Sequence, residues 1–596
     1  DHVNPFNDTI YTWGVSGAYR FDIGFMIDRL SSLLMIVVTF VSLMVHIYSI
    51  GYMNDDPGYQ RFFCYMSLFT FFMLMLVMAN NFLQLFFGWE GVGLVSYLLI
   101  GFWYKKESAN VGSLKAFIVN RIGDLGFIVG IAAILDYCNT LDYSTVFTQA
   151  SYLASTSIQV LPGLHWSLLS VICILLFIGA MGKSAQMPLH VWLPESMEGP
   201  TPISALIHAA TMVTAGIFMV ARLSPLFAYS EAALSFMLVI GASTALFTGI
   251  LGLVQYDIKR VIAYSTLSQL GYMVAALGAS AFSAGIFHLV THAFFKALLF
   301  LAAGSVIVAL HHEQDMRKMG GLRKYMPVTY VTFLIGGLAL SAIPPFAGFY
   351  SKDIIIDAVH LTTIPGATYA YVCLLLGAFV TALYTFRAVF YAFHTEERFD
   401  DHVKSHLKES PWVIWVPLIL LAIPSVLSGA LLVSKLIYGA PGLLGNTVTE
   451  NPSLNVLKIM THEYHGAINS IWQAFSSLPL WFALAGIFTA WVCYIAVPSL
   501  PGKVVAHFKL IYRILIHKYG FDAFNQKVFV QGTQKLSDML FKICDVKFID
   551  DWFINGSGRL INWLSSSTRR LQTGYIYHYT MVMVCGLIVF LVWLFW

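Results

Sequence analysis

The chain has 596 residues, of which 58% are apolar and 11% are charged, and its formal net charge is +3. Because about 25% of the residues of an ordinary soluble protein are charged, this chain has too few charges to cover several soluble domains. Composition therefore excludes a soluble globular protein, and the lack of long basic runs argues against nucleic-acid binding. The seven cysteines are scattered without a CxxC pair, which argues against an iron–sulfur or structural zinc site on this chain.

The first 29 residues mix polar and aromatic side chains and lack the basic start and short apolar core of a signal peptide. Because the chain starts at Asp1 rather than Met, we expect the native N-terminus to be missing.

Apolar stretches of about 20 residues then recur, each long enough to cross about 30 Å of hydrocarbon as a helix. This pattern predicts an all-α polytopic membrane protein with about fourteen spans. The predicted spans are 30–50, 62–80, 81–103, 113–136, 164–197, 201–223, 233–254, 258–278, 283–309, 328–360, 368–393, 412–434, 479–498 and 576–596.

Lys and Arg gather on one side when these spans alternate across the membrane. The loops on the opposite side, 137–163 and 361–367, contain neither residue. By the positive-inside rule the basic side is cytoplasmic. The loop residues that place it are Arg61, Lys105, Lys106, Lys259, Arg260, Arg317, Lys318, Arg323, Lys324, Arg398, Lys404 and Lys408.

Two of the spans, 164–197 and 328–360, are too long for one crossing and contain prolines, which break helices. Broken helices at membrane depth survive only where protein or water satisfies the freed backbone groups. The breaks, at Pro188 and at Pro344-Pro345, lie close to Lys183 and Lys352.

Each broken helix is the fourth of five crossings, which predicts two inverted repeats, 62–223 and 233–393. The remaining predicted parts are an N-terminal segment with the first helix, further helices, a cytoplasmic-side amphipathic lateral helix region and a terminal helix. Their ranges are 1–61, 394–500, 501–575 and 576–596. In the lateral helix region the apolar residues Leu536, Leu540, Ile543 and Val546 recur at helical spacing, and we expect an interruption at Asn555–Gly558.

Ionisable residues inside the spans cost about 2.5–3.5 kcal/mol each on insertion scales, so each requires a reason. We expect Glu90 to pair with Lys183 and to hold it protonated, so that separation releases the proton. A static structural ion pair is the alternative.

His288, His292 and Lys296 follow one another at steps of four and therefore share one helical face. A ladder of titratable groups suits proton relay, because histidine exchanges a proton near neutral pH. The alternatives are helix–helix hydrogen bonding, and a zinc site that the neighbouring lysine disfavours.

The sequence alone leaves the roles of the other charged residues inside the spans less definite. His208 is either a relay group or a satisfied core histidine, and Lys352-Asp353 is either a self-neutralising pair or the end of a relay. Arg121 and Asp124 can neutralise each other at i,i+3. Lys115 can reach the cytoplasmic edge, Lys259 and Arg260 fit orientation by positive charge, and Arg387 has no obvious partner.

Several stretches resemble the large antiporter-like membrane subunits of complex I, the proton-pumping NADH-quinone oxidoreductase. They are GWEGVGL (88–94), NRIGD (120–124), GKSAQMPL (182–189), GPTPISALIHAATMV (199–213), DIKRVIAYST (257–266), HLVTHAFFK (288–296) and GFYSKD (348–353). The later GFD (520–522) and KVFV (527–530) resemble the stretch before the lateral helix of the subunit L branch. That family usually has two more helices before the first one found here.

The resemblance implies a proton-translocating subunit of a bacterial inner-membrane complex, driven by quinone reduction in other subunits. It implies no cofactor or metal on this chain, with FMN, iron–sulfur clusters, NADH and quinone bound elsewhere. Its partners would be other membrane-arm subunits, especially neighbouring antiporter-like ones, and the lipid bilayer. The implied site residues are Glu90, Lys183, His208, Lys259, His288, His292, Lys296, Lys352 and Asp124, and we add Asp353 as the neighbour of Lys352 at the end of a relay. Alternatives are a subunit of a Mrp-type cation/proton antiporter, or of a hydrogenase-like or inorganic-carbon-uptake membrane complex.

Overall fold

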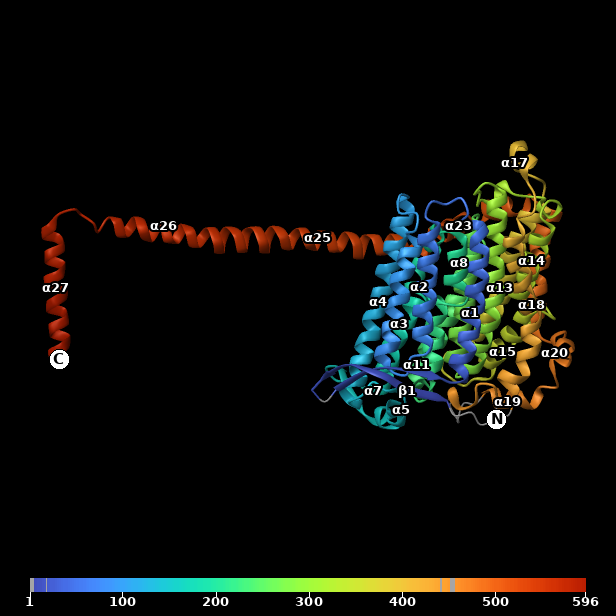
Figure 1. Ribbon diagram of the computed structural model, residues 1–596, viewed down its shortest axis with the longest axis horizontal. Coiled ribbons are helices and arrows are strands. Elements are labelled where there is room, and N and C mark those ends of the chain that lie inside the picture. The colour runs from blue at the N-terminus through green and yellow to red at the C-terminus, as the bar shows by residue number, and fades with distance from the viewer. Residues whose placement is uncertain (1–4, 18, 440–441, 451–455) are drawn as a thin grey trace. The chain divides into compact units, whose positions relative to one another are not determined.

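The computed structural model describes residues 5–17, 19–439, 442–450 and 456–596. These residues form two compact units, Asp1–Tyr519 and Gly520–Trp596. Figure 1 shows the first unit as a bundle of long, side-by-side helices, with β1 and α5 at one end and α17 and α23 at the other. The two ends correspond to the two sides of the membrane that the loop charges predict.

The long helices of the first unit are separated by short turns and loops. They are α1 (Arg29–Tyr52), α2 (Tyr59–Val77), α3 (Phe82–Ile100), α4 (Glu107–Cys138), α7 (Leu168–Lys183), α11 (Glu231–Gly252), α12 (Ile258–Gly278), α13 (Phe282–Ala309), α14 (Pro327–Leu340), α15 (Ala347–Leu361), α16 (Ala367–Val389), α18 (Trp412–Val433) and α21 (Leu478–Trp491). The shorter helices are α5 (Tyr143–Thr148), α6 (Ala150–Ser155), α8 (Thr201–Ala209), α9 (Ala215–Arg222), α10 (Ser224–Phe227), α17 (Asp401–His406), α19 (Val456–Glu463), α20 (Ala467–Ala474), α22 (Leu500–His507) and α23 (Lys509–Ile516).

Among the described residues, twelve helical segments are long and apolar enough to cross a membrane. They coincide with twelve of the predicted spans. The other two predicted spans, 164–197 and 328–360, contain the shorter apolar helices α7 and α14. The chain is therefore a multi-pass, all-α membrane protein, while the number of crossings and the inverted repeats stay predictions.

Both predicted helix breaks are present. Helix α7 ends at Lys183, and Pro188 lies in the irregular segment that precedes two 3-10 turns, η1 (Leu189–Trp192) and η2 (Pro194–Glu198). Helix α14 ends at Leu340, and Pro344-Pro345 precede α15.

The span 201–223, predicted as one helix, is also interrupted. Helix α8 ends at Ala209 and α9 resumes at Ala215, because Thr211 leaves the helical conformation with φ −125° and ψ −98°. The hydroxyl of Thr211 donates to the Leu206 carbonyl, and that of Thr214 donates to the Thr211 carbonyl. Threonine hydroxyls thus offer the backbone alternatives to the helical hydrogen-bond ladder.

Two antiparallel hairpins lie outside the helices and were not predicted. Strands β1 (Phe6–Ser16) and β2 (Tyr19–Ile27) pair from Phe6↔Ile27 to Ser16↔Tyr19. The Met26 amide donates to the Met78 carbonyl, which ties this hairpin to the end of α2. A smaller hairpin joins β3 (Ser157–Leu161) and β4 (Leu164–Ser167).

Small residues let the helices approach closely. A Cβ at Gly241 of α11 would lie 2.5 Å from the Ala275 nitrogen of α12, and one at Gly123 of α4 would lie 3.0 Å from the Gly182 Cα of α7. Such contacts are typical of helix packing in membranes. Helices α12 and α13 occupy the centre, with 100% and 89% of their most apolar stretches buried, so their polar side chains face protein rather than lipid.

The second unit contains α24 (Phe521–Asn525), η12 (Gln526–Val530), α25 (Gln531–Leu540), η13 (Phe541–Ile554), α26 (Asn555–Arg569) and the terminal α27 (Ile576–Phe595). The expected interruption at Asn555–Gly558 is wrong, because Ile554 and Asn555 keep helical angles. The two glycines, Gly556 and Gly558, disfavour a helix by about 2 kcal/mol in total. This cost is small enough for the helical turns on both sides to continue through the segment. Arg559 also donates to the Asp551 carbonyl at 2.7 Å across this segment.

Candidate functional site

Lys183, the last residue of α7, is buried with its Nζ 3.8 Å from Oδ2 of Asp124 on α4. The other oxygen of Asp124 accepts a 2.7 Å hydrogen bond from Trp89 Nε1. A Cβ at Gly93 would collide with Lys183 Nζ, so this glycine leaves the room that the ammonium occupies beside α3. The close contact of Gly123 with Gly182 places Asp124 and Lys183 opposite each other.

The predicted direct pair between Glu90 and Lys183 is wrong in this structure. Glu90 forms an ion pair with Arg121 instead, and Arg121 Nη1 lies 3.8 Å from Oδ2 of Asp124. Four charges therefore run in the order Glu90, Arg121, Asp124, Lys183. The sequence did not predict this order. Arg121 lies one helical turn before Asp124, and from there it forms the ion pair with Glu90 that was expected for Lys183.

The turn at Glu195–Gly199, which follows the first broken helix, holds two of the predicted residues. Lys259, at the start of α12, is buried and donates from Nζ to the carbonyls of Met197 at 2.6 Å and Gly199 at 2.7 Å. His208, in the last turn of α8, lies with Nε2 3.0 Å from the Ser196 hydroxyl. Lys259 thus donates hydrogen bonds to backbone carbonyls of the turn after the helix break, a role that orientation by positive charge did not predict.

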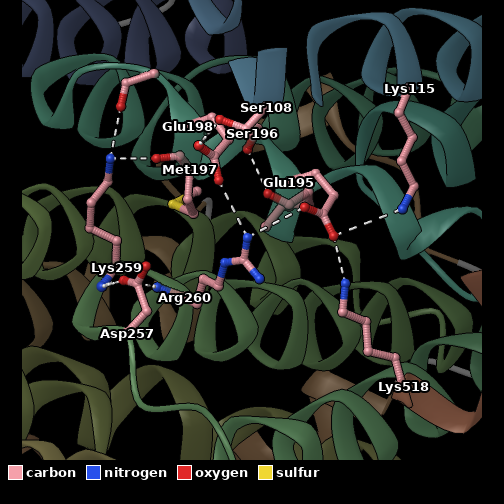
Figure 2. A network of polar contacts seen from close by, with 12 residues as sticks. Ser108, Lys115, Glu195, Ser196, Met197, Glu198, Asp257, Lys259, Arg260 and Lys518 are labelled. Carbon is pink, nitrogen blue, oxygen red and sulfur yellow. Dashed lines mark hydrogen bonds and ion pairs between the residues drawn. The ribbon is translucent and has the colours of Figure 1, made fainter. Parts of the chain in front are cut away.

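Charged side chains surround the outer side of the same turn (Figure 2). The Glu195 carboxylate lies 2.5 Å from Lys518 Nζ, 3.5 Å from Arg260 Nη2 and 4.0 Å from Lys115 Nζ. Lys115 therefore reaches this edge of the bundle, as predicted. Glu198 lies 3.4 Å from Arg260 and accepts a 2.8 Å hydrogen bond from Ser108. Glu195 was missed, since its partners are spread over the chain.

The three residues predicted to form a ladder on α13 are fully buried. Lys296 donates to the Ser265 hydroxyl and, at 3.4 Å, to the Ile262 carbonyl of α12. The His292 ring lies 6.2 Å from the His288 ring, centre to centre.

His288 is held between two neighbouring helices. Its Nδ1 lies 2.8 Å from Ser351 Oγ on α15, and its Nε2 lies 3.0 Å from Gln269 Oε1 on α12. Among the described residues no group of three His, Cys, Asp or Glu side chains is arranged to hold a metal ion, so a zinc site at His288 and His292 lacks a third ligand.

Lys352 and Asp353 do not form the self-neutralising pair that was one of the two predictions. Among the described residues Lys352 Nζ has no hydrogen-bond partner, and it lies 4.5 Å from the centre of the Tyr272 ring. Asp353 instead lines a cavity of about 260 Å³ together with Asp357 and His360. Adjacent residues of one helix point to different faces, so Lys352 faces the centre of the bundle and Asp353 faces the cavity.

Aromatic and electrostatic contacts link these groups. Trp192 Nε1 donates to the Gly182 carbonyl at 3.0 Å, and its ring centre lies 6.4 Å from that of His208. Lys259 and His208 both contact the turn at Glu195–Gly199, and His288 contacts Ser351, the residue before Lys352. The predicted residues therefore form a buried line, with Glu90 and Asp353 at more exposed positions.

Two arginines are also buried among the described residues of the bundle, and both have partners. Arg387 donates to the Gln255 carbonyl at 2.5 Å and lies over the rings of Tyr256, Tyr391 and Tyr494, which supplies the partner that the sequence did not indicate. Arg222, which was missed, forms a bidentate pair with Asp28 at the start of α1.

The fold and this line of buried charges define a class, that of proton-translocating membrane subunits of the antiporter-like type. The family model described as "NADH:quinone oxidoreductase/Mrp antiporter, TM" matches residues 79–381, and the model described as "NADH-Ubiquinone oxidoreductase (complex I), chain 5 N-terminus" matches residues 13–63. NADH-quinone oxidoreductase subunit L of Neisseria meningitidis serogroup A is 52% identical over 99% of this chain and 90% of its own length. The chain therefore belongs to the family of NADH-quinone oxidoreductase L subunits.

More distant relatives agree. NADH-ubiquinone oxidoreductase chain 5 of Marchantia polymorpha is 43% identical over 98% of this chain and 86% of its own length. Two solved structures share the fold at low identity. A chain of the Mrp complex from Dietzia sp. DQ12-45-1b has a TM-score of 0.68 at 21% identity, covering 98% of this chain and 57% of that one. A chain of an archaeal membrane-bound sulfane sulfur reductase has a TM-score of 0.61 at 23% identity, covering 78% and 88%.

Proposed function

We propose that H⁺ crosses a bacterial inner membrane along the buried charges of this chain, driven by quinone reduction in other subunits. NADH, FMN, the iron–sulfur clusters and quinone would bind to those subunits, and this chain would carry no redox centre. Its neighbours would be further antiporter-like membrane subunits.

One observation carries the proposal: α13 holds His288, His292 and Lys296 at full burial, with Lys296 in contact with Ser265 of α12 and His288 in contact with Ser351 of α15. Burying a charge without a partner is costly, so such groups persist in a membrane protein chiefly where they serve transport. The cavity beside Asp353 would give the line an outlet on the side opposite the basic loops.

Lys183 would load and release a proton by exchanging anionic partners. In this structure it faces Asp124, while Glu90 faces Arg121. Gly93 and Glu90 are three residues apart on α3, so the ammonium already lies one helical turn from the carboxylate. Movement of Arg121 away from Glu90 would free that carboxylate for Lys183, and the reverse movement would favour proton release toward the His208 imidazole, which can accept a proton.

The experiment is proton translocation by the purified, reconstituted complex with Lys296→Met. We expect quinone-linked acidification to be lost while the complex remains assembled. Lys404→Met, on the exposed α17, is the matched control and should translocate normally. Unchanged translocation in Lys296→Met would contradict the proposed line. Translocation that requires Na⁺ rather than H⁺ would favour the cation-antiporter alternative, to which the fold shared with the Mrp chain gives secondary support.

A further inference from the structure

The short turn Glu195–Gly199 joins the outside of the bundle to its buried charges. The side chain of Glu195 faces Lys518, Arg260 and Lys115, whereas the carbonyls of Met197 and Gly199 hold Lys259. Because these atoms belong to one short turn, a displacement of the Glu195 side chain would shift the oxygens that bind Lys259. Figure 2 shows the two sets of contacts on the same turn.

The same turn also positions His208. Ser196 follows Glu195 directly, and its hydroxyl contacts both the Leu193 carbonyl and His208 Nε2. The turn is pressed against α4, since a Cβ at Gly112 would lie 2.8 Å from the Glu195 carbonyl oxygen. It therefore has little room to move unless its ion pairs change.

Lys518 comes from the far end of the first unit's sequence. It immediately precedes Tyr519, whose hydroxyl donates to the Phe247 carbonyl of α11 at 3.1 Å and whose ring packs edge-on against Phe247. Lys518 and Tyr519 have positive φ values of 51° and 57°. Residues other than glycine keep this conformation only where surrounding contacts hold it, and such strain often marks functional positions.

We propose that Glu195 is a positioning residue for Lys259 and His208, and that Lys518 holds Glu195 in place. The chain would thereby connect the last residues of the first unit to the turn that presents two groups of the proton path. This inference rests on the proposed function of Lys259 and His208, and it adds a residue pair whose members lie 323 positions apart.

The test is made on the complete reconstituted complex with Lys518→Met, Lys518→Arg, Glu195→Gln and the double variant Lys518→Met/Glu195→Gln. The charged groups that face Glu195 are Lys518, Arg260 and Lys115, and Arg260 in turn faces Glu198 and Asp257. A carboxylate that loses a neighbouring ammonium is protonated at higher pH. We therefore expect Lys518→Met to move the acidic limb of the translocation profile to higher pH, by about one unit at most.

Three comparisons make this result specific. Lys518→Arg should restore the wild-type profile, and the double variant should translocate no less than Glu195→Gln, because both changes act through one carboxylate. Lys404→Met, which breaks the 2.7 Å pair with Glu397 on the same predicted side, is the control and should leave the profile unchanged. Hydrogen exchange of the backbone at residues 195–199 should accelerate in Lys518→Met and not in Lys404→Met.

The inference would be overturned if Lys518→Met and Lys404→Met had the same pH profile of translocation and the same hydrogen-exchange rate at residues 195–199. It would also be overturned if the losses of translocation in the two single variants added up in the double variant. If Lys518→Met blocks assembly, Lys518→Gln takes its place in both measurements. Lys259→Met separates the two proposals. If Lys259→Met translocates protons normally, the proposed proton path is wrong. If Lys259→Met loses translocation while Lys518→Met keeps the wild-type profile, only the positioning role of Glu195 is wrong.

Discussion

Asp124 and Lys183 face each other 3.8 Å apart, where α4 and α7 meet through Gly123 and Gly182. The pair is buried and continues through Arg121 to Glu90. A buried ammonium with one carboxylate in reach depends on that carboxylate for its charge. Asp124 is therefore the carboxylate nearest to the Lys183 ammonium while Glu90 is bound to Arg121.

Asp124→Asn should consequently uncouple proton transfer from electron transfer. The amide can still accept from Trp89, so the local fold is retained, but Lys183 loses its counter-charge. We expect proton translocation to fall about tenfold or more, the change produced by 1.4 kcal/mol in an activation barrier. Pumping and quinone reductase rates are measured on the same vesicles. Trp89→Phe removes the hydrogen bond to Asp124 but leaves its charge, so it should reduce translocation less. Equal losses of translocation in the two variants would show that the charge of Asp124 is not what matters.

Ser351 connects the second broken helix to the α13 ladder, since its hydroxyl lies 2.8 Å from both His288 Nδ1 and Thr291 Oγ1. Ser351→Ala should slow translocation about fivefold, because one neutral hydrogen bond contributes about 1 kcal/mol. The matched control is Ser425→Ala, whose buried hydroxyl bonds only within its own helix as far as the described contacts show. Translocation rates that are equal in the two variants would remove Ser351 from the path.

The sequence predicted those features of the site that depend only on the spacing of nearby residues. His288, His292 and Lys296 share a face because helical periodicity requires it, and Lys183 and Lys352 were located by nearby prolines. The partner of each charge was not predictable in the same way. It depends on where two helices approach, as at Gly123 and Gly182, and the sequence does not show that approach.

Long separations explain the other omissions. Asp28 and Arg222 pair across 194 positions, and Glu195 and Lys518 across 323, so neither pair leaves a local signal. The β1–β2 hairpin was missed for a different reason. Most residues of β1 are exposed and most residues of β2 are half-buried, so the burial that imposes alternation on a strand pattern is weak there.

Arg222→Met should destabilise the assembled complex, because it leaves the Asp28 carboxylate buried without its partner. Breaking a buried ion pair from one side costs about 3–5 kcal/mol, whereas removing both charges is often nearly neutral. The double variant Arg222→Met/Asp28→Asn should therefore melt at a higher temperature than Arg222→Met alone. Thermal denaturation of the purified complex gives both values. A double variant that is less stable than the single one would show that the pair contributes little.

Glu450 predicts a pH dependence of stability outside the membrane-spanning helices. Burial raises the pKa of its carboxyl from 4.5 to about 7, and a hydrogen bond from the Ser283 side chain opposes that change. Between these two pH values the folded chain keeps a proton that the unfolded chain has released. Stability therefore falls as pH rises through this window, by on the order of 3 kcal/mol in all.

Glu450→Gln keeps a neutral, hydrogen-bonding side chain and cannot lose a proton, so it should escape this loss. We expect its melting temperature to exceed that of the wild-type complex at pH 8, and the difference to shrink toward zero near pH 5. The exposed Glu107 at the start of α4 provides the control, since Glu107→Gln should show no such convergence. A pH-independent difference between Glu450→Gln and wild type would mean that the carboxyl is not held neutral by burial.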